Sequence, residues 1–506
     1  MPNNPPTPNP VPAARALRAR FQADWRRPRY HFVSPEGSCH PFDPNGALWW
    51  RGRCHLFYIV QVEGLGHCWG HASTVDLLHW RIHPLALVPG QGDEGIFSGC
   101  ALLDKNGVPT IVYLGVRTGI CLARSADDEL IHWAKDPANP VIPIPEEGSP
   151  EAAQYIVHDP HAWLEGDRYY VLTNGRRSLG GREGDTSYLF RSPDLLHWEY
   201  LHPFYEPNPA WTGPEEDCAC PDFFALGDRH VLLCISHYAG ARAYVGRYAN
   251  QRFLPERHVR MNWPGGTMFA PESLVDPRSG RRIFWGWVCP GRTRAAIDRA
   301  GWSGVMSLPR VLSLDEAGEL RVEPAAEVER LRLDRVHAEG IDLMPGQDWP
   351  VEGLCDWAWE IELEVDADQL AAVDELALRV CCAPDGSEGT RIVYSPSAGT
   401  LSIDATRASL SPEVFWPWPH PHRLEGPMPE ERVQRAPLAL DPGEPLHLRV
   451  YLDGSILEVY ANGRVCVTQR IYPTRSDSTG VALACAGGPL RVRRLRGWDM
   501  AATVAW

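Results

Sequence analysis

The chain contains three copies of one short pattern, Ser73-Thr-Val-Asp-Leu-Leu-His-Trp80, Ser125-Ala-Asp-Asp-Glu-Leu-Ile-His-Trp133 and Ser192-Pro-Asp-Leu-Leu-His-Trp198. Each copy follows a stretch of alternating apolar and polar residues, so the repeating unit is a few antiparallel strands closed by a turn. The copies are roughly 50 to 65 residues apart, which is the period of β-propeller blades. Because a propeller places one strand of every blade around a common axis, carboxylates far apart in sequence can meet at its mouth.

Strand patterns continue to about Leu312, after an N-terminal arm at residues 1–28 that begins with a run rich in proline and asparagine. We place a catalytic propeller domain at residues 29–315, a linker at 316–335 and a β-sandwich domain at 336–506. The second domain has strand patterns at Trp357–Val365, Leu376–Cys382, Arg391–Ser395, Leu446–Leu452, Ile456–Tyr460 and Val465–Ile471. The expected fold class is therefore all-β.

Composition narrows the class of partner. A net charge of -15 disfavours nucleic acid and anionic membranes, since both are polyanions that require a basic surface. Twenty tryptophans and sixteen tyrosines favour a small neutral carbohydrate, because aromatic faces stack on sugar rings. Neither a signal peptide nor a run of about 18 apolar residues is visible, so we expect a cytoplasmic protein whose cysteines are reduced thiols.

Three acidic clusters stand at the edges of predicted strands. They are Asp43-Pro-Asn-Gly46, His158-Asp-Pro160 and Glu215-Glu-Asp217, the last running into Cys218-Ala-Cys-Pro221. Taken singly, each is typical of a turn or a solvated loop. Their occurrence in three different predicted blades favours one shared site.

The chain resembles glycoside hydrolase family 32, the β-fructofuranosidases, over nearly its whole length. The resemblance rests on the order and spacing of the following segments: Asp43-Pro-Asn-Gly46, His55-Leu-Phe-Tyr58, Trp69-Gly-His-Ala72, Phe97-Ser-Gly99, His158-Asp-Pro160, Cys220-Pro-Asp-Phe-Phe224, Phe269-Ala-Pro271, Arg281-Arg-Ile-Phe-Trp-Gly-Trp287, Gly301-Trp-Ser-Gly304, Leu308-Pro-Arg310 and Leu457-Glu-Val-Tyr460. It implies a five-bladed β-propeller followed by a C-terminal β-sandwich. It also implies a retaining glycoside hydrolase that releases terminal furanosyl residues, β-D-fructofuranosyl above all, from sucrose-like oligosaccharides or fructans.

Catalytic roles follow from the same resemblance. Asp43 corresponds to the nucleophile, which forms a covalent glycosyl-enzyme intermediate, and Asp159 corresponds to the residue that stabilises the transition state. The third role, a general acid/base, falls on Ala219, where the family has the glutamate of Glu-Cys-Pro. We expect Glu216 to replace it, because its side chain is long, with Asp217 as the alternative on the face of Ala219.

Further residues occupy positions that line the family's pocket. The resemblance implies substrate contacts for Asn45, Trp69, Phe97, Ser98, His158, Glu272 and Trp285. Glu272 is also a second-choice acid. Phe42, Ile59 and His158 replace the polar family residues Asn, Gln and Arg, so the furanose class is better supported than fructose itself.

Other interpretations remain open. No cofactor is expected, because the sequence contains no nucleotide-binding fingerprint. No metal is expected either, because Cys218-Ala-Cys220 has no second pair of cysteines or histidines at a suitable spacing. The second domain resembles a module that in some relatives mediates homo-oligomerisation. Fructosyl transfer or another furanosidase activity would use the same residues. A carbohydrate-binding pseudoenzyme would follow if the acid has been lost.

Overall fold

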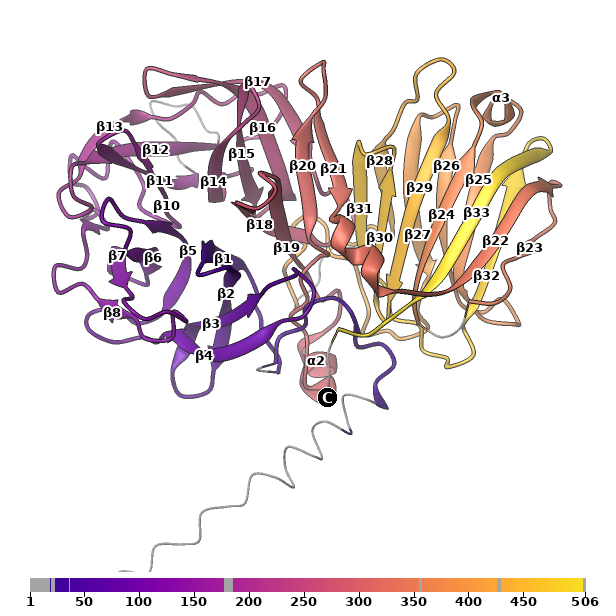
Figure 1. Cartoon of the computed structure of the whole chain (residues 1–506), viewed down its shortest axis with the longest axis horizontal. Coiled ribbons are helices and arrows are strands. Elements are labelled where there is room, and N and C mark those ends of the chain that lie inside the picture. The colour runs from indigo at the N-terminus through magenta and orange to yellow at the C-terminus, as the bar shows by residue number, and fades with distance from the viewer. Residues whose placement is uncertain are drawn as a thin grey trace, which may run out of the picture.

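The computed structural model describes residues 19, 23–35, 37–176, 185–354, 357–425 and 429–503. It is almost entirely β, which confirms the expected fold class. Two regions lie side by side, the first ending with Pro324 and the second beginning with Arg332 (Figure 1). Most of the N-terminal arm expected at residues 1–28 lies outside the described residues.

The first region consists of five successive antiparallel sheets. Their strands are β1 (Pro44–Trp50), β2 (Arg53–Val62), β3 (Gly66–Thr74) and β4 (Arg81–Leu87); β5 (Ile96–Leu103), β6 (Pro109–Gly115), β7 (Gly119–Arg124), β8 (Ala134–Lys135) and β9 (Ile142–Pro143); β10 (His161–Glu165), β11 (Arg168–Arg176), β12 (Asp185–Ser192) and β13 (Glu199–Pro203); β14 (Ala219–Leu226), β15 (Arg229–Ser236), β16 (Gly240–Ala249) and β17 (Arg252–Arg260); and β18 (Met268–Val275), β19 (Arg282–Val288), β20 (Arg310–Leu314) and β21 (Leu320–Pro324). A short helix, α2 (Arg294–Ala300), interrupts the last sheet.

The first strands of these sheets are neighbours. Strand β1 contacts both β5 and β18, β5 contacts β10, and β14 contacts both β10 and β18. Side chains that precede or begin these strands can therefore meet, although they are far apart in the sequence.

The sequence repeat forms the turn between the third and fourth strands of the first three sheets. In the first copy, the Asp76 carboxylate accepts hydrogen bonds from the backbone N–H groups of Leu78 and His79. In the third copy, Asp194 binds Leu196 and His197 in the same way. The repeated aspartate thus satisfies backbone donors that a tight turn leaves without partners.

Four of the first strands are bulged close to their beginnings. The pairing register shifts between Asn45 and Leu48 in β1, Ile96 and Gly99 in β5, Ala219 and Asp222 in β14, and Phe269 and Glu272 in β18. Cys220, inside the third of these shifts, has φ of 47°. A bulge turns the strand and redirects the side chains at the shift, which is a common arrangement beside functional sites.

The second region has two six-stranded sheets. In spatial order, one contains β22 (Arg332–Leu343), β33 (Leu490–Met500), β24 (Ala358–Val365), β29 (Leu446–Asp453), β30 (Ile456–Ala461) and β31 (Val465–Arg470), and the other contains β23 (Trp349–Pro350), β32 (Gly480–Ala486), β25 (Glu375–Cys382), β26 (Gly389–Ser395), β27 (Thr400–Arg407) and β28 (Val433–Pro437). Buried apolar side chains of both sheets form one cluster. A short helix, α3 (Ala367–Leu370), lies at the edge of the second region (Figure 1).

Polar contacts join the two regions. Asp453, at the end of β29, accepts hydrogen bonds from the backbone N–H groups of Arg29, Tyr30 and His31, which precede the first sheet. Glu458 in β30 forms a buried ion pair with Arg310 in β20, with nitrogen and oxygen 3.1 Å apart. The expected linker at 316–335 contains β21, the 3₁₀ helix η1 (Ala326–Leu331) and the start of β22.

Candidate active site

Two aspartates and a cysteine from three different sheets come together. Asp43 directly precedes β1, Asp159 lies just before β10, and Cys220 occupies the bulge of β14. The Sγ atom of Cys220 is 3.5 Å from Asp159 Oδ2 and 3.8 Å from Asp43 Oδ2. Ser98, in the bulge of β5, donates a hydrogen bond of 3.0 Å to Asp43 Oδ2. The first two acidic clusters of the sequence therefore share one site.

The turn that carries Asp43 is held by its own motif. Asn45 is only 1% exposed, and its amide donates to the carbonyl of Asp43 at 2.8 Å and accepts from the backbone N–H of Gly99 at 3.2 Å. Gly46 has φ of 55°, and a Cβ there would lie 3.1 Å from Phe57 and 3.2 Å from Trp69. Asn45, expected to contact substrate, thus has contacts that position the Asp43 backbone.

The pKa values of Asp43 and Asp159 are shifted in opposite directions. Burial and the charge of Asp159 raise the pKa of Asp43 to about 7, although the hydrogen bond from Ser98 opposes them. Burial also raises the pKa of Asp159, but the charge and hydrogen bond of His158 outweigh it and leave that pKa below its usual value. A pair of acids whose environments push their pKa values apart is typical of sites in which the two carboxyls have different roles.

His158 supplies the positive charge beside Asp159. Its Nδ1 lies 2.9 Å from Asp159 Oδ2, and its side chain is partly exposed. The charge of Asp159 raises the pKa of His158, which favours the imidazolium. A binding role was expected for His158, and the structure places it directly against the Asp159 carboxylate.

A second histidine, His237, was not found from the sequence. It follows β15, and the Asp217 carboxylate accepts hydrogen bonds from its backbone N–H at 2.8 Å and from its Nδ1 at 2.7 Å. Burial lowers the pKa of His237, but Asp217, Asp159 and Asp43 raise it to about 8 overall. The imidazolium of His237 therefore belongs to the same electrostatic cluster as the two aspartates.

Glu216, the acid/base expected from the sequence, is engaged elsewhere. It is 3% exposed, and its carboxylate binds Arg242 and Arg260 with nitrogen–oxygen distances of 2.8 Å in both pairs. Burial raises its pKa, but the two arginines lower it below the usual value. A general acid needs a raised pKa, so these contacts favour a structural ion-pair role for Glu216. Asp217, the alternative, also has a lowered pKa, because His237 outweighs burial.

Three of the other expected pocket residues are buried. Trp69 and Trp285 are fully buried, and the Trp69 indole N–H donates to the carbonyl of Phe97 at 3.0 Å. Glu272 is buried and accepts a hydrogen bond of 2.9 Å from the backbone N–H of Ala47, on the Asp43 turn. Trp69, Trp285 and Glu272 are thus buried packing residues, whereas Ser98 contacts Asp43 directly.

A loop of the second region reaches the site beside His237. The backbone N–H of His420 donates to the carbonyl of Tyr238 at 2.9 Å, and its Nδ1 lies 3.1 Å from the carbonyl oxygen of His237. The ring of His422 lies 5.7 Å from that of His237 and 5.1 Å from that of Phe269. One wall of the site therefore comes from a segment about 180 residues away in the sequence.

One group of histidines has ligand atoms close enough for a metal. These nitrogens of His55, His71 and His83 lie within 4.8 Å of one another. However, the rings of His55 and His71 are tilted by only 26°, those of His71 and His83 by 21°, and the first two share a 2.9 Å hydrogen bond. His83 Nε2 in turn lies 2.7 Å from Ser73 Oγ, so the three histidines belong to a hydrogen-bonded cluster.

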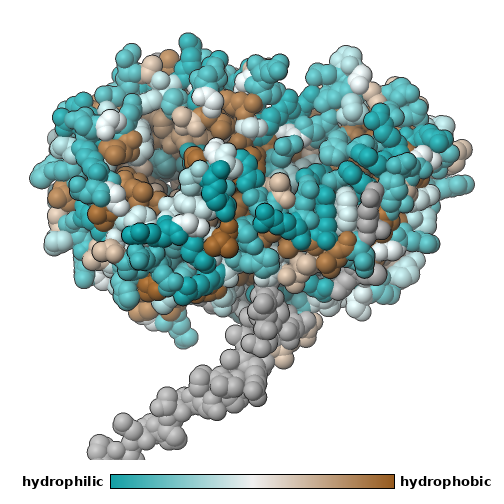
Figure 2. All heavy atoms as spheres, viewed as in Figure 1, coloured by the Kyte–Doolittle hydropathy of each residue, from teal (hydrophilic) through white to brown (hydrophobic). Residues whose placement is uncertain are grey.

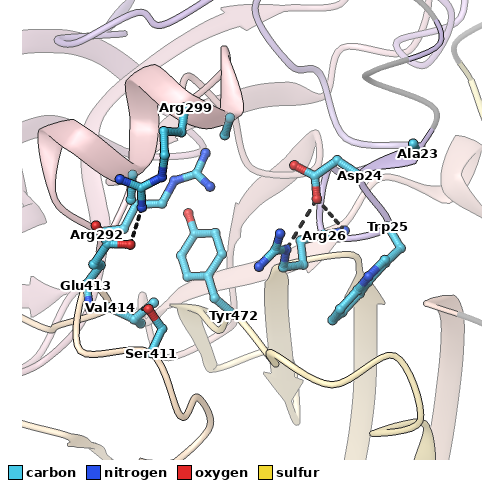
Figure 3. Close-up of a pocket in the computed structure, with 12 residues that line it drawn as sticks. Ala23, Asp24, Trp25, Arg26, Arg292, Arg299, Ser411, Glu413, Val414 and Tyr472 are labelled. Atoms are coloured by element: carbon cyan, nitrogen blue, oxygen red, sulfur yellow. Dashed lines mark hydrogen bonds and ion pairs between the residues drawn. The ribbon is translucent and has the colours of Figure 1, made fainter.

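A separate pocket of about 350 Å³ lies between the two regions. Trp25 and Arg26 line one side of it, and Arg292, Glu413 and Tyr472 line the other (Figure 3). None of the clustered carboxylates lines this pocket.

The molecular surface seen in Figure 2 is mostly hydrophilic, with smaller hydrophobic patches between the hydrophilic areas. Within the described ranges, no helix has the length and apolar character needed to cross a membrane.

Comparison with known proteins identifies the family. Residues 31–324 match the glycosyl hydrolases family 32 N-terminal domain, and residues 329–499 match the glycosyl hydrolases family 32 C-terminal domain. The chain therefore belongs to glycosyl hydrolase family 32. The match covers both regions of the structure.

Two curated relatives and one solved structure illustrate the similarity. The chain is 30% identical to a sucrose-6-phosphate hydrolase of Escherichia coli, over 88% of this chain and 89% of that protein. It is 27% identical to beta-fructofuranosidase, insoluble isoenzyme 2, of Oryza sativa subsp. indica, over 94% of this chain and 90% of the relative. Fructan 1-exohydrolase IIa from Cichorium intybus superposes with a TM-score of 0.80 at 22% identity, covering 94% of this chain and 98% of the other.

Proposed function

We propose that this protein is a retaining glycoside hydrolase that releases terminal β-D-fructofuranosyl residues from sucrose-like oligosaccharides or fructans. The observation that carries the proposal is the pair of buried carboxylates, Asp43 and Asp159, brought from two sheets onto the Cys220 thiol. Relatives named as beta-fructofuranosidase and sucrose-6-phosphate hydrolase support the fructosyl specificity.

In the proposed mechanism Asp43 is the nucleophile. Its carboxylate attacks the anomeric carbon as the glycosidic C–O bond breaks, and the fructosyl group becomes esterified to Asp43. Water then displaces Asp43 from the opposite side, so the configuration is retained after two displacements. Asp159, kept ionised by His158, stabilises the positive charge that develops on the sugar ring in both steps.

The proposed architecture is a five-bladed propeller with its site at the axis. The contacts of β1 with both β5 and β18 support closure of the first region, and the two six-stranded sheets around one core support a β-sandwich. We keep the domain limits 29–315 and 336–506, with a linker between them, as part of this proposal.

The altered pocket supports two narrower alternatives. Phe42 and Ile59 are buried, so they contribute packing where the family has polar side chains. A furanoside other than fructose, or transfer to an acceptor sugar, would use the same nucleophile. A carbohydrate-binding pseudoenzyme is favoured by Ala219, which is 1% exposed and has no carboxyl group to offer.

The cytoplasm is the proposed location. The described cysteines are thiols, most of them buried, which suits a reducing compartment.

Incubation of the purified protein with sucrose, 1-kestose, inulin and levan oligosaccharides tests the function. Free fructose is measured beside an Asp43→Asn variant, which keeps the shape of the side chain but lacks the nucleophile. Fructose release by the wild-type protein alone supports the proposal. Binding of these sugars by both proteins without release would support the pseudoenzyme.

A further inference from the structure

His237 directly follows β15, the strand that pairs with β14, and β14 begins at Ala219, the position of the missing acid. Ala219 in β14 pairs with Ile235 in β15. When this antiparallel register is extended by two residues toward the site, Asp217 comes opposite His237, as their hydrogen bonds show. His237 therefore lies two residues beyond Ile235, the partner of Ala219, and next to the segment that leads into β14.

Asp217 fixes the orientation of the His237 ring. Its two carboxylate oxygens accept from the backbone N–H and from Nδ1 of the same histidine. This assigns the Nδ1–H tautomer and leaves Nε2 as the atom that can exchange a proton. The His237 side chain is 45% exposed, and the charges of Asp159 and Asp43 act on its ring. An aspartate that orients an imidazole through Nδ1 is the arrangement by which hydrolases build a histidine acid/base.

Charged groups around His237 favour its protonated form. Asp217, Asp159 and Asp43 all raise its pKa, while His158 and His422 are the other titratable side chains that interact with it. The pKa of His422 is lowered to about 3, chiefly by burial, so that ring stays neutral beside His237. An imidazolium at neutral pH can donate a proton, and the imidazole that remains can accept one.

Other groups near the site fit the role less well. The Cys220 thiol lies between the two aspartates, but burial and their charges raise its pKa well above the usual value, so it does not cycle between protonation states at neutral pH. Glu216 is held by two arginines. Burial raises the pKa of Glu272 well above its usual value, but this side chain is buried and accepts a hydrogen bond from the backbone N–H of Ala47.

We propose that His237 replaces the family's glutamate as general acid/base and that Asp217 is its positioning residue. The proposal rests on the function proposed above. In the first step, the glycosidic C–O bond breaks as Asp43 attacks, and the proton on His237 Nε2 passes to the leaving oxygen. In the second step, the neutral Nε2 takes a proton from a water molecule. The water oxygen bonds to the anomeric carbon as the bond between that carbon and Asp43 breaks. The protonated ring is then restored.

The test compares leaving groups that need a proton with one that does not. We expect His237→Gln to lower kcat for sucrose by about 10²- to 10⁴-fold. On 4-nitrophenyl β-D-fructofuranoside, whose phenolate leaves unprotonated, the variant should show a burst of 4-nitrophenol within about tenfold of the wild-type rate. Azide needs no general base, so added azide should restore turnover and yield β-fructofuranosyl azide.

The matched control is His197→Gln. His197 pairs with Asp194 as His237 pairs with Asp217, with Nδ1 2.8 Å from the carboxylate, but it lies on an exposed turn. This control should keep wild-type rates on both substrates.

Two results would overturn the role of His237 and leave the proposed function intact. One is full activity of His237→Gln on sucrose. The other is an equal loss on both substrates without azide rescue, which would indicate a structural role. Failure of the wild-type protein to release fructose from any substrate would instead overturn the proposed function, and the role of His237 with it.

Discussion

Removal of the Ser98 hydroxyl should shift the pH dependence of the enzyme toward higher pH. Ser98 donates to Asp43 Oδ2 at 3.0 Å in a buried site, and this hydrogen bond opposes the effects of burial and of Asp159, which together leave the pKa of Asp43 at about 7. A hydrogen bond to a charged group contributes about 1.5 to 3 kcal/mol, which corresponds to roughly one to two pKa units. Ser98→Ala should therefore raise the pKa of Asp43 to roughly 8 or 9.

The direction of this pH shift follows from the proposed role of Asp43 as nucleophile. The carboxylate must be ionised to attack, so the acidic limb of kcat/KM against pH reports its pKa in the free enzyme. Loss of the hydrogen bond disfavours the ionised form, and the limb moves up by about one to two pH units. At pH 6, kcat/KM should fall by roughly 10- to 100-fold from this cause alone.

The assay is fructose release from sucrose between pH 5 and pH 9. Ser279→Ala is the matched control, because Ser279 donates to Asp276 Oδ2 at 3.1 Å in an exposed turn of the fifth sheet. It should leave the profile unchanged. An acidic limb that stays in place in Ser98→Ala, or moves to lower pH, would refute the assignment of that limb to Asp43.

Three further predictions concern Asp43, Asp217 and Gly46. The pKa of Asp43 is raised from 3.8 to about 7, so its protonated form stabilises the fold below about pH 4 and this contribution is lost as the pH rises to about 7. Asp43→Asn should therefore be more stable than the wild type at pH 8, by at most roughly 4 kcal/mol, and the difference should shrink at pH 4 in thermal unfolding. Asp217→Asn removes the group that most raises the pKa of His237, so the alkaline limb of kcat/KM against pH should move below about pH 8. An alkaline limb that does not move would contradict His237 as the acid. Gly46→Ala places a Cβ 3.1 Å from Phe57 at a residue with φ of 55°. This substitution should lower the free energy of unfolding by about 1 to 3 kcal/mol and should also lower fructose release. An unchanged urea unfolding curve would contradict the strain argument.

Local patterns in the sequence predict much of the fold. The three repeat turns and the period-two strands are encoded by neighbouring residues, and the expected strands Leu446–Leu452 and Ile456–Tyr460 correspond to β29 and β30 almost residue for residue. The turn residues Asp453-Gly454 and Asn462-Gly463 end these strands. Such features need no knowledge of distant contacts.

The acid/base was harder to predict, because it depends on where a strand begins. Alternation back from Ala219 assumed an extended strand through Glu215, but β14 begins at Ala219. Glu216 lies in a turn before it, where its carboxylate accepts from the backbone N–H of Gly213 and meets Arg242 and Arg260. The face of a residue outside a strand does not follow from alternation.

His237 and the second-region loop depend on contacts between distant segments. His237 meets Asp217 only because β14 and β15 pair in this register, and His420 and His422 reach it only because the two regions pack together. An acidic residue two positions before Ala219 and a histidine just after the next strand are a usable signal once a hairpin is recognised. The loop at 411–425 carried no comparable signal.

The most direct test of the account is the stereochemistry of transfer to methanol. Methyl fructofuranosides keep their anomeric configuration, so the product formed from sucrose in dilute methanol can be assigned by NMR. A covalent intermediate on Asp43 predicts methyl β-D-fructofuranoside from the wild-type protein and none from Asp43→Asn. Methyl α-D-fructofuranoside, or an unchanged yield from the variant, would contradict Asp43 as nucleophile.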